Sequence, residues 1–308
     1  MPGPFTHMMI CQAAKNLDEL LGEELWKFLN KYYQFLFLGA ESPDLPYLSI
    51  GVGGNHWADA MHYERTNSQV ISGFEELRPA WPVRTPADEV KCAWLLGYVS
   101  HMVADATVHP IVQAIVGPYK GHEEAHRLCE MTMDSLIFDE IIHAGLTYAE
   151  FSDALKFCKE SEHFRELLDF WQAQLSKNYA GMAHEAEPSI WFTEYTDLLD
   201  LAEGGKVTAI FRHLGVGGNY VYRTAEDIRT NTPEDYQQYF AAVKFPGGGS
   251  GPFRTTGFER AVNNVATIWK ALYRGLTDFG LAVSQVVRNW NLDTGGDQEA
   301  GNVVTFWS

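Results

Sequence analysis

Apolar residues recur at three- and four-residue steps along most of this chain. Between Ala13 and Phe37 the repeat consists of Leu17, Leu20, Leu21, Leu25, Phe28 and Leu29. This spacing gathers side chains on one face of an α-helix, so it predicts a long amphipathic helix. The same pattern predicts helices at 57–77, 87–109 and 122–143, and further helical segments near 147–159, 162–179, 223–243 and 256–289.

Prolines and glycines interrupt the helical pattern. Pro110 is expected to end the third predicted helix, because the residue before a proline is disfavoured in the α conformation. The glycine-rich run 246–252 is either a lid or a long surface connection. Strand signals are scarce, the best being residues 303–307. The predicted fold class is therefore all-α, with a single multi-helix domain over residues 1–308.

The composition is that of a globular protein large enough to bury a substantial core. The 308 residues are 46% hydrophobic and 20% charged, and no apolar run is long enough to predict a membrane span. Residues 1–7 contain neither the basic nor the apolar region of a signal peptide. No secretory leader is therefore expected. The cytoplasm, a non-classical export route and secretion with a leader already removed are all compatible with the sequence.

The formal net charge is −17. Such a field repels nucleic-acid backbone and anionic membrane surface, so no nucleic acid partner is expected and a neutral or zwitterionic substrate fits better. The four cysteines are scattered and show no C-x-x-C spacing. We expect them to be reduced and buried, without a chemical role.

Histidine is concentrated in the first half of the chain, where eight of the 11 histidines fall at or before residue 143. In the third predicted helix, His101, Asp105 and His109 are four residues apart and therefore share one stripe. Gly97 lies one turn earlier on that stripe and is expected to leave room for an ion or a ligand.

The fourth predicted helix repeats the device with His126, Glu130 and Asp134. A single such histidine is usually a hydrogen-bonded core or surface residue. Six ligand-type residues on two stripes in an apolar context would be costly to bury unless a metal satisfied them. Zinc takes histidine nitrogen and carboxylate oxygen, so the pattern predicts a zinc cluster.

Residues 122–126 also read His-Glu-Glu-Ala-His, the H-E-x-x-H pattern of zinc peptidases. That motif should lie well inside a helix, whereas Gly117, Pro118 and Gly121 place His122 at the first turn. No third ligand follows at the usual spacing. A zinc peptidase is kept as an alternative.

Several of these motifs together resemble the zinc-dependent phospholipase C family. They are Ser-His-Met-Val-Ala-Asp at 100–105 followed by His109, Glu-Ala-His at 124–126 with Glu130 and Asp134, Phe-Thr-His at 5–7, and the Gly-x-x-x-Pro-Asp turn at 39–44. The resemblance is strongest to the catalytic domain of glycosylphosphatidylinositol-specific phospholipases D. Bacterial phosphatidylcholine-preferring phospholipases C and P1-type nucleases are more distant. It covers residues 1 to about 145 well, so 1–145 is expected to be the metal-binding half and 146–308 to supply supporting helices.

The resemblance implies two or three zinc ions. One would take Asp44, His62, His101 and Asp105, and another His109, His126 and Glu130. A third would take His7, Asp105 and the amino-terminal group. The histidine that follows the Pro-Asp turn is either His56 or His62, and the surrounding sequence favours His62.

The activity implied is hydrolysis of a phospholipid or another phosphodiester by attack of a metal-bound hydroxide on phosphorus. Asp44 is the catalytic candidate, because it would orient or deprotonate the attacking water. Transient contact with a membrane surface would need apolar residues, for which Trp191, Phe192, Phe245 and Phe253 are candidates. The rival hypotheses are a nuclease or nucleotidase on the same metals, the zinc peptidase, and a metal-stabilised binding protein.

Overall fold

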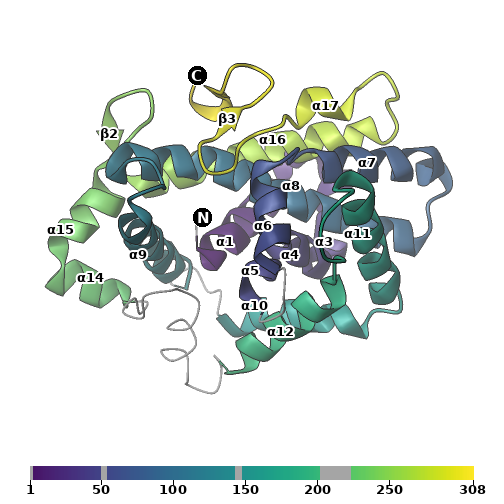
Figure 1. Ribbon diagram of the computed structural model, residues 1–308, viewed down its shortest axis with the longest axis horizontal. Helices are drawn as coiled ribbons and strands as arrows, with labels where there is room; N and C mark the ends of the chain where they lie inside the picture. Colours follow the sequence, from purple (N-terminus) through teal and green to yellow (C-terminus); the bar gives the residue numbers. More distant parts are fainter. Residues whose placement is uncertain (1–2, 50–53, 143–147, 202–222) are drawn as a thin grey trace.

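The computed structural model describes residues 3–49, 54–142, 148–201 and 223–308, and these segments are mainly helical (Figure 1). The α-helices are α1 (Pro4–Lys15), α2 (Asp18–Leu21), α3 (Glu23–Lys31), α4 (Tyr33–Glu41), α5 (Leu45–Leu48), α6 (Gly54–Tyr63), α7 (Ser68–Leu77), α8 (Pro86–Val116), α9 (Glu123–Ile142), α10 (Tyr148–Phe157), α11 (Phe164–Asn178), α12 (Pro188–Leu201), α14 (Ala225–Asn231), α15 (Pro233–Tyr236), α16 (Glu259–Gly275) and α17 (Val283–Val286). The predicted all-α class is confirmed.

Short helical turns and strands complete the described chain. The turns are η1 (Arg78–Val83), η2 (Cys158–Glu160), η4 (Gln237–Ala241), η5 (Phe253–Phe258) and η6 (Thr305–Trp307). The strands are β1 (Val243–Lys244), β2 (Ser250–Gly251), β3 (Gly296–Asp297) and β4 (Val303–Val304). They form two antiparallel pairs, β1 with β2 and β3 with β4.

The longest helix, α8, carries the predicted histidine stripe. It begins at a capping box in which Thr85 and Asp88 satisfy each other's backbone N–H groups. Contrary to the prediction, α8 does not end near Pro110 but continues to Val116. A proline inside a helix removes one hydrogen bond. The C-terminal part of the chain contacts α8 close to this missing hydrogen bond. The indole N–H of Trp307 donates to the carbonyl of Thr107 at 2.7 Å.

Two predicted helices are divided in the structure. The predicted helix at 13–37 spans the end of α1, then α2, α3 and most of α4, with Gly22 adopting a φ of +83° between α2 and α3. The predicted helix at 57–77 is α6 and α7, separated by a turn in which Arg65 has a φ of +47°. A left-handed residue cannot continue a right-handed helix, which explains the break at Gly22 and the break at Arg65.

The remaining boundaries differ in smaller ways. Segment 223–243 is divided into α14, α15 and η4, and segment 256–289 into η5, α16 and α17. Helix α12 was not predicted. The strand expected at 303–307 is only β4, after which the chain turns into η6.

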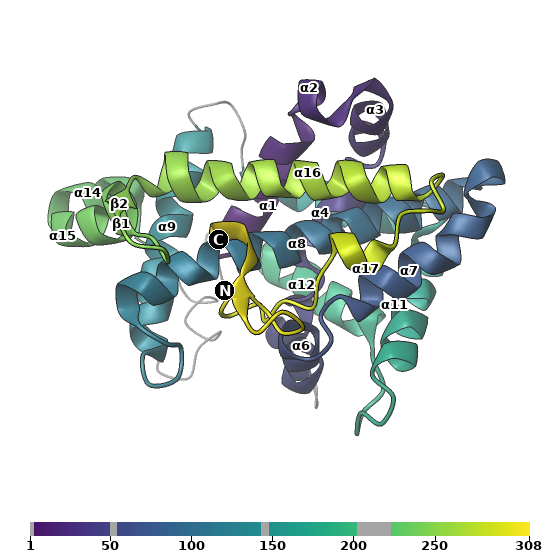
Figure 2. The same ribbon diagram turned by 90° about the horizontal axis from the view of Figure 1, so that it is seen from above.

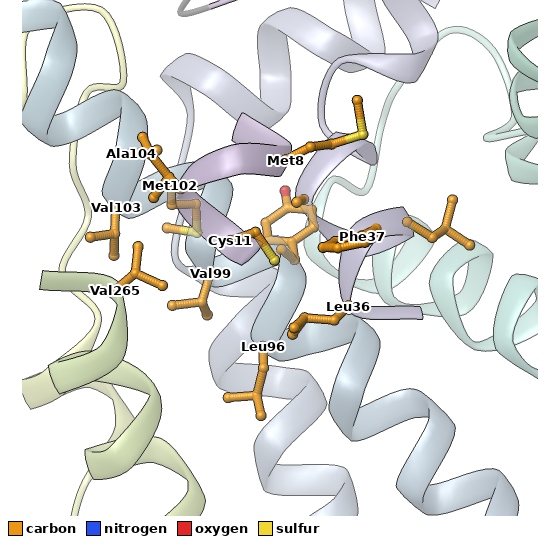
Figure 3. Packing of buried hydrophobic residues seen from close by; sticks show 14 of the residues in the cluster. Met8, Cys11, Leu36, Phe37, Leu96, Val99, Met102, Val103, Ala104 and Val265 are labelled. Carbon is orange, nitrogen blue, oxygen red and sulfur yellow. The ribbon is translucent and has the colours of Figure 1, made fainter. Parts of the chain in front are cut away.

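The core lies where α1, α4, α8 and α16 pack together. Figure 3 shows Met8 of α1, Leu36 of α4, Met102 and Val103 of α8, and Val265 of α16 in one apolar cluster, and all five are buried. Figure 2 shows α16 running along α8. Helix α8 is therefore covered by packed side chains from both halves of the sequence, which holds its histidine stripe in a fixed position.

Helices α4 and α8 cross at very short range. A Cβ atom added to Gly97 would lie 2.0 Å from the carbonyl oxygen of Leu36, and one added to Gly39 would lie 2.1 Å from the carbonyl oxygen of Trp94. The expectation that Gly97 leaves room for an ion is therefore wrong. The backbone of α4 occupies the space that a side chain at Gly97 would need. This close approach brings the end of α4 to the histidine stripe.

The aromatic residues expected to approach lipid lie mostly in the core. Trp191, Phe192 and Phe253 are buried, and Phe245 is half-buried with its ring stacked on that of Trp307. The apolar-approach interpretation is therefore wrong for the first three, because packed rings cannot reach a membrane without unfolding. The run 246–252 is the connection and second strand of the β1–β2 hairpin.

Two further expectations concern the cysteines and the membrane. All four cysteines, Cys11, Cys92, Cys129 and Cys158, are free and buried, as predicted. Among the described helices, none combines the length and the apolar character needed to cross a bilayer.

Candidate metal centre

The stripe on α8 forms the floor of a buried polar cluster. His101 and Asp105 have no exposed surface and His109 has 2%. Helical spacing alone aligns them, and the packing around α8 removes them from water. Such polar side chains are costly to bury unless each finds a partner.

The end of α4 supplies the first partner and the first neighbouring carboxylate. The Gly39–Gly97 contact places the carbonyl oxygen of Ala40 2.8 Å from Nδ1 of His101. Because a carbonyl only accepts, Nδ1 carries the hydrogen and Nε2 faces the cluster. The chain then leaves α4 through the Pro-Asp turn, which places Asp44 in the cluster.

His62 comes to the same point from α6. Its Nδ1 donates to the carbonyl of Ala58 at 2.7 Å, and its Nε2 lies 3.2 Å from Oδ1 of Asp44 and 3.2 Å from Nε2 of His101. Asp44, His62 and His101 thus converge within a space that one cation would span. The other candidate, His56, is exposed and stacks on His184.

His7 joins the cluster from α1. Its Nε2 lies 3.3 Å from Oδ1 of Asp105, while Nε2 of His101 lies 3.3 Å from Oδ2 of the same carboxylate. His7, His101 and Asp105 form a second convergent group. The amino-terminal group expected beside His7 lies outside the described residues.

Asp134 has a different place from the other acids. Its Oδ1 accepts hydrogen bonds from the backbone N–H of Thr6 at 2.6 Å and from the Thr6 hydroxyl at 2.8 Å. The carboxylate also sits against Gly3, whose added Cβ would lie 2.3 Å from it. Asp134, on α9, thus caps the first turn of α1. The N-terminus of a helix favours a negative charge, so this contact is stabilising and holds His7 in position.

The third part of the cluster joins α8 to α9. Nε2 of His109 lies 3.6 Å and Nδ1 of His126 3.9 Å from Oε1 of Glu130. Each histidine uses its other nitrogen for a backbone carbonyl, His109 that of Leu292 and His126 that of Gly117. Nδ1 of His109 is also 3.9 Å from Oδ1 of Asp105, so this part adjoins the two groups above.

The pKa values follow from burial and from the carboxylates. Burial alone would lower the pKa of His101, but Asp105 and Asp44 outweigh it and raise that pKa to about 9. Burial, reinforced by His101, lowers the pKa of His7 to about 4. Burial would raise the pKa of Asp105, yet His101 and His109 hold it well below its usual value.

Several ligand-type atoms in this cluster have no hydrogen-bond partner among the described residues. They are both ring nitrogens of His7, Oδ1 of Asp44, both carboxylate oxygens of Asp105 and Nε2 of His109. Buried polar atoms are normally paired, so an unpaired set that converges is a set prepared for a ligand. Imidazole nitrogens and carboxylate oxygens are donors that suit zinc, and the residues therefore fit that metal.

His122 of the H-E-x-x-H pattern lies apart from the cluster. It is exposed, precedes α9, and its Nδ1 contacts the carbonyl of Pro118 at 2.9 Å. Only His126 of the pair points inward. This geometry does not favour the peptidase alternative, in which both histidines would hold one ion.

Two features of the cluster were missed by sequence reasoning. The backbone carbonyls that orient the rings leave no trace in residue type. Glu41, which is 2% exposed and accepts a hydrogen bond from Tyr195 at 3.2 Å, is the other. A single acid at the end of the largely apolar run 33–40 was a signal that could have found it.

The fold and the cluster together define the class of protein: an all-α protein whose buried histidine and carboxylate side chains suit zinc. Comparison with known proteins is consistent with that class: the family model described as zinc dependent phospholipase C matches residues 6–188. The match covers more than half of the chain, and the protein belongs to the zinc-dependent phospholipase C family. No curated protein and no solved structure matches the chain.

Proposed function

We propose that the protein is a zinc-dependent phosphodiesterase that hydrolyses a phospholipid in the manner of a phospholipase C. The proposed ligands are His7, Asp44, His62, His101, Asp105, His109, His126 and Glu130. The observation that carries the proposal is the convergence of His7, His101 and Asp105, and of Asp44, His62 and His101, in one buried cluster that includes unpaired donor atoms. His109, His126 and Glu130 adjoin this cluster. The family to which the chain belongs supports the same activity.

When bound, zinc would supply Lewis-acid stabilisation of phosphate charge and a water of lowered pKa. The protein's own contribution is orientation. The carbonyls of Ala58 and Ala40 hold His62 and His101 with Nε2 turned toward Asp44. Hydrogen bonds of this kind, from a ligand ring to a backbone carbonyl, fix the tautomer of the ring and raise its basicity as a ligand.

Asp44 is the residue proposed to act on the attacking water. Burial alone would raise the pKa of this carboxyl, but His101 and His62 outweigh it and lower the pKa. Asp44 is therefore ionised at neutral pH and able to accept a hydrogen bond from water. It is also 9% exposed, more than Asp105, so water and substrate approach it more readily.

The net charge of −17 bears on the substrate class. A strongly acidic protein repels a polyanion, so a zwitterionic phospholipid is preferred over single-stranded nucleic acid. The same metal cluster would still accept a small nucleotide, and this alternative is separated from the lipid by assay.

The test combines metal analysis with parallel assays. Zinc content is measured, and hydrolysis of short-chain phosphatidylcholine, single-stranded DNA and a peptide is followed with and without a chelator. We expect zinc-dependent release of a phosphorylated head group and diacylglycerol from the lipid only. Lipid turnover that survives complete removal of metal would contradict the proposal, and release of phosphatidic acid would place cleavage on the other side of the phosphate.

A further inference from the structure

His109 is oriented by a part of the chain far from it in sequence. The acceptors for His62 and His101 are Ala58 and Ala40, both within residues 6–188. The acceptor for Nδ1 of His109 is the carbonyl of Leu292, which lies 183 positions away and outside those residues. Since that carbonyl only accepts, His109 is held with Nδ1 protonated and Nε2 turned toward Glu130.

Leu292 contacts a second histidine through its other backbone group. Its N–H donates to the carbonyl of His62 at 3.1 Å. One residue therefore bridges the backbone of α6 and the imidazole of α8. The next residue extends this link, because the carbonyl of Asp293 accepts a hydrogen bond from the side chain of Gln113 at 2.7 Å.

The segment from 288 to 297 is itself fixed in shape. The side-chain oxygen of Asn291 accepts the N–H groups of Asp293 and Thr294, both at 3.1 Å. Arg288 and Asp297 close the ends of the segment with an ion pair at 2.9 Å. Figure 2 shows this part of the chain, in yellow, lying against α8.

The segment meets α8 where Pro110 has no N–H to give to the carbonyl of Ala106. Gly295 lies on that carbonyl: an added Cβ would be 2.4 Å from the Ala106 oxygen and 2.6 Å from Cγ of Pro110. Gly295 also has a φ of +67°, a backbone angle that residues other than glycine rarely adopt. Any larger residue at 295 must move the segment away from α8, and Leu292 with it.

We infer that the 288–297 segment is a positioning element of the metal centre, with Leu292 holding the imidazole of His109 and Gly295 and Gln113 holding Leu292. The inference rests on the proposed function, in which His109, His126 and Glu130 bind one zinc. Loosening the segment therefore weakens the binding of that ion more than the binding of the others, because Leu292 contacts the imidazole of His109 but only the backbone of His62. The ion bound by Asp44, His62 and His101 keeps its carbonyl partners from other elements.

The experiment uses Gly295→Ala and Gln113→Leu in the full chain. Gly301→Ala is the matched control for the first, because Gly301 has a φ of +68° but no atom within 4 Å of an added Cβ. Gln172→Leu, at an exposed position of α11, is the control for the second. Zinc is titrated into metal-free protein against a competing chelator, and the tautomer of His109 is read from the ¹⁵N shifts of histidine-labelled protein.

We expect both test variants to lose about tenfold or more in affinity for one ion and markedly less in affinity for the other ions. We also expect the Nδ1–H signature of His109 to weaken in the metal-free variants and to persist in both controls. Gln113→Leu keeps the test open if Gly295→Ala fails to fold.

Wild-type affinity for every ion with an unchanged His109 tautomer would overturn the inference, as would an equal weakening of all ions. A wild-type protein that hydrolyses no phosphodiester would instead overturn the proposed function. The tautomer measurement decides the present inference even in that case.

Discussion

The imidazole of His7 stacks on that of His101, with ring centroids 4.0 Å apart and planes only 10° from parallel. The two rings approach opposite oxygens of Asp105, each at 3.3 Å. Two positive rings in such contact would repel each other, so one proton is accommodated where two are not. Burial, reinforced by this repulsion, lowers the pKa of His7 to about 4, whereas Asp105 and Asp44 raise that of His101 to about 9.

Replacing Asp105 should remove the charge that both rings share. In metal-free Asp105→Asn we expect the pKa of His101 to fall from about 9, because burial then acts with less opposition. We also expect loss of the two zinc ions that Asp105 is proposed to bridge. Histidine-selective NMR and zinc analysis measure the two effects. Asp59→Asn, at an exposed position of α6, is the control, and wild-type zinc content in Asp105→Asn would contradict the bridging role.

Zinc binding should release a proton from His101. The ring is protonated at pH 7 in the metal-free protein, since its pKa of about 9 exceeds the ordinary 6.5. That proton stabilises the metal-free fold fully below pH 6.5, and the contribution is lost as pH rises through 9. Zinc affinity should therefore rise about tenfold for each pH unit between about 7 and 9.

Calorimetric titration in buffers of different ionisation enthalpy measures the released proton. His7 provides an internal comparison, because its pKa of about 4 leaves it neutral across the whole range. A zinc affinity independent of pH between 7 and 9 would show that His101 is neither protonated nor a ligand.

Glu41 should make the metal-free protein less stable as pH rises. Burial, with the nearby charge of Asp44, raises the pKa of this carboxyl well above its usual value. For an acid whose folded pKa is raised, stability is lost as pH rises above the unfolded pKa of about 4.5, by about 1.4 kcal/mol for each unit of the shift. Glu41→Gln should therefore increase the free energy of unfolding at pH 7 and leave it almost unchanged at pH 4.

Denaturant unfolding of metal-free protein at both pH values checks this effect. Glu75→Gln, at an exposed position of α7, should alter stability at neither pH. Tyr195→Phe removes the hydrogen bond to Glu41 and should cost about 1 kcal/mol. A lower free energy of unfolding for Glu41→Gln at pH 7 would contradict the prediction, because it would mean that the ionised carboxylate is stabilised by a partner in the folded protein.

Enlarging Gly97 should separate α4 from α8. A methyl group there would lie 2.0 Å from the carbonyl oxygen of Leu36, so Gly97→Ala should cost about 1–3 kcal/mol or more by overpacking. Moving α4 away from α8 would also lengthen the Ala40–His101 hydrogen bond and weaken the binding of zinc. Thermal unfolding and zinc titration measure the change. Gly247→Ala, whose Cβ would meet nothing closer than 4.0 Å, should leave both unchanged.

Helical periodicity was sufficient to predict the all-α class and the shared face of His101, Asp105 and His109, because both depend only on local spacing. It was insufficient where distant segments decide the outcome. Pro110 lies inside α8 although local preference predicted an end there. That a metal binds the cluster stays a prediction.

The meaning of Gly97 was also beyond a single sequence. A glycine on a ligand stripe is equally compatible with space for an ion and with contact by another backbone. Only the position of α4 distinguishes the two. The same holds for Asp134, which the proposed ligand sets leave out: its spacing fits a ligand, but its neighbour in space is the first turn of α1.

The oxygens that hold His62, His101 and His109 all belong to the main chain, at Ala58, Ala40 and Leu292. Substituting any of these three residues leaves its carbonyl in place. The orientation of the rings is thus insensitive to side-chain change at the positions that provide it. In a mutational scan, damage to the orientation of these rings should concentrate at glycines such as Gly39 and Gly295, where a new side chain displaces the backbone.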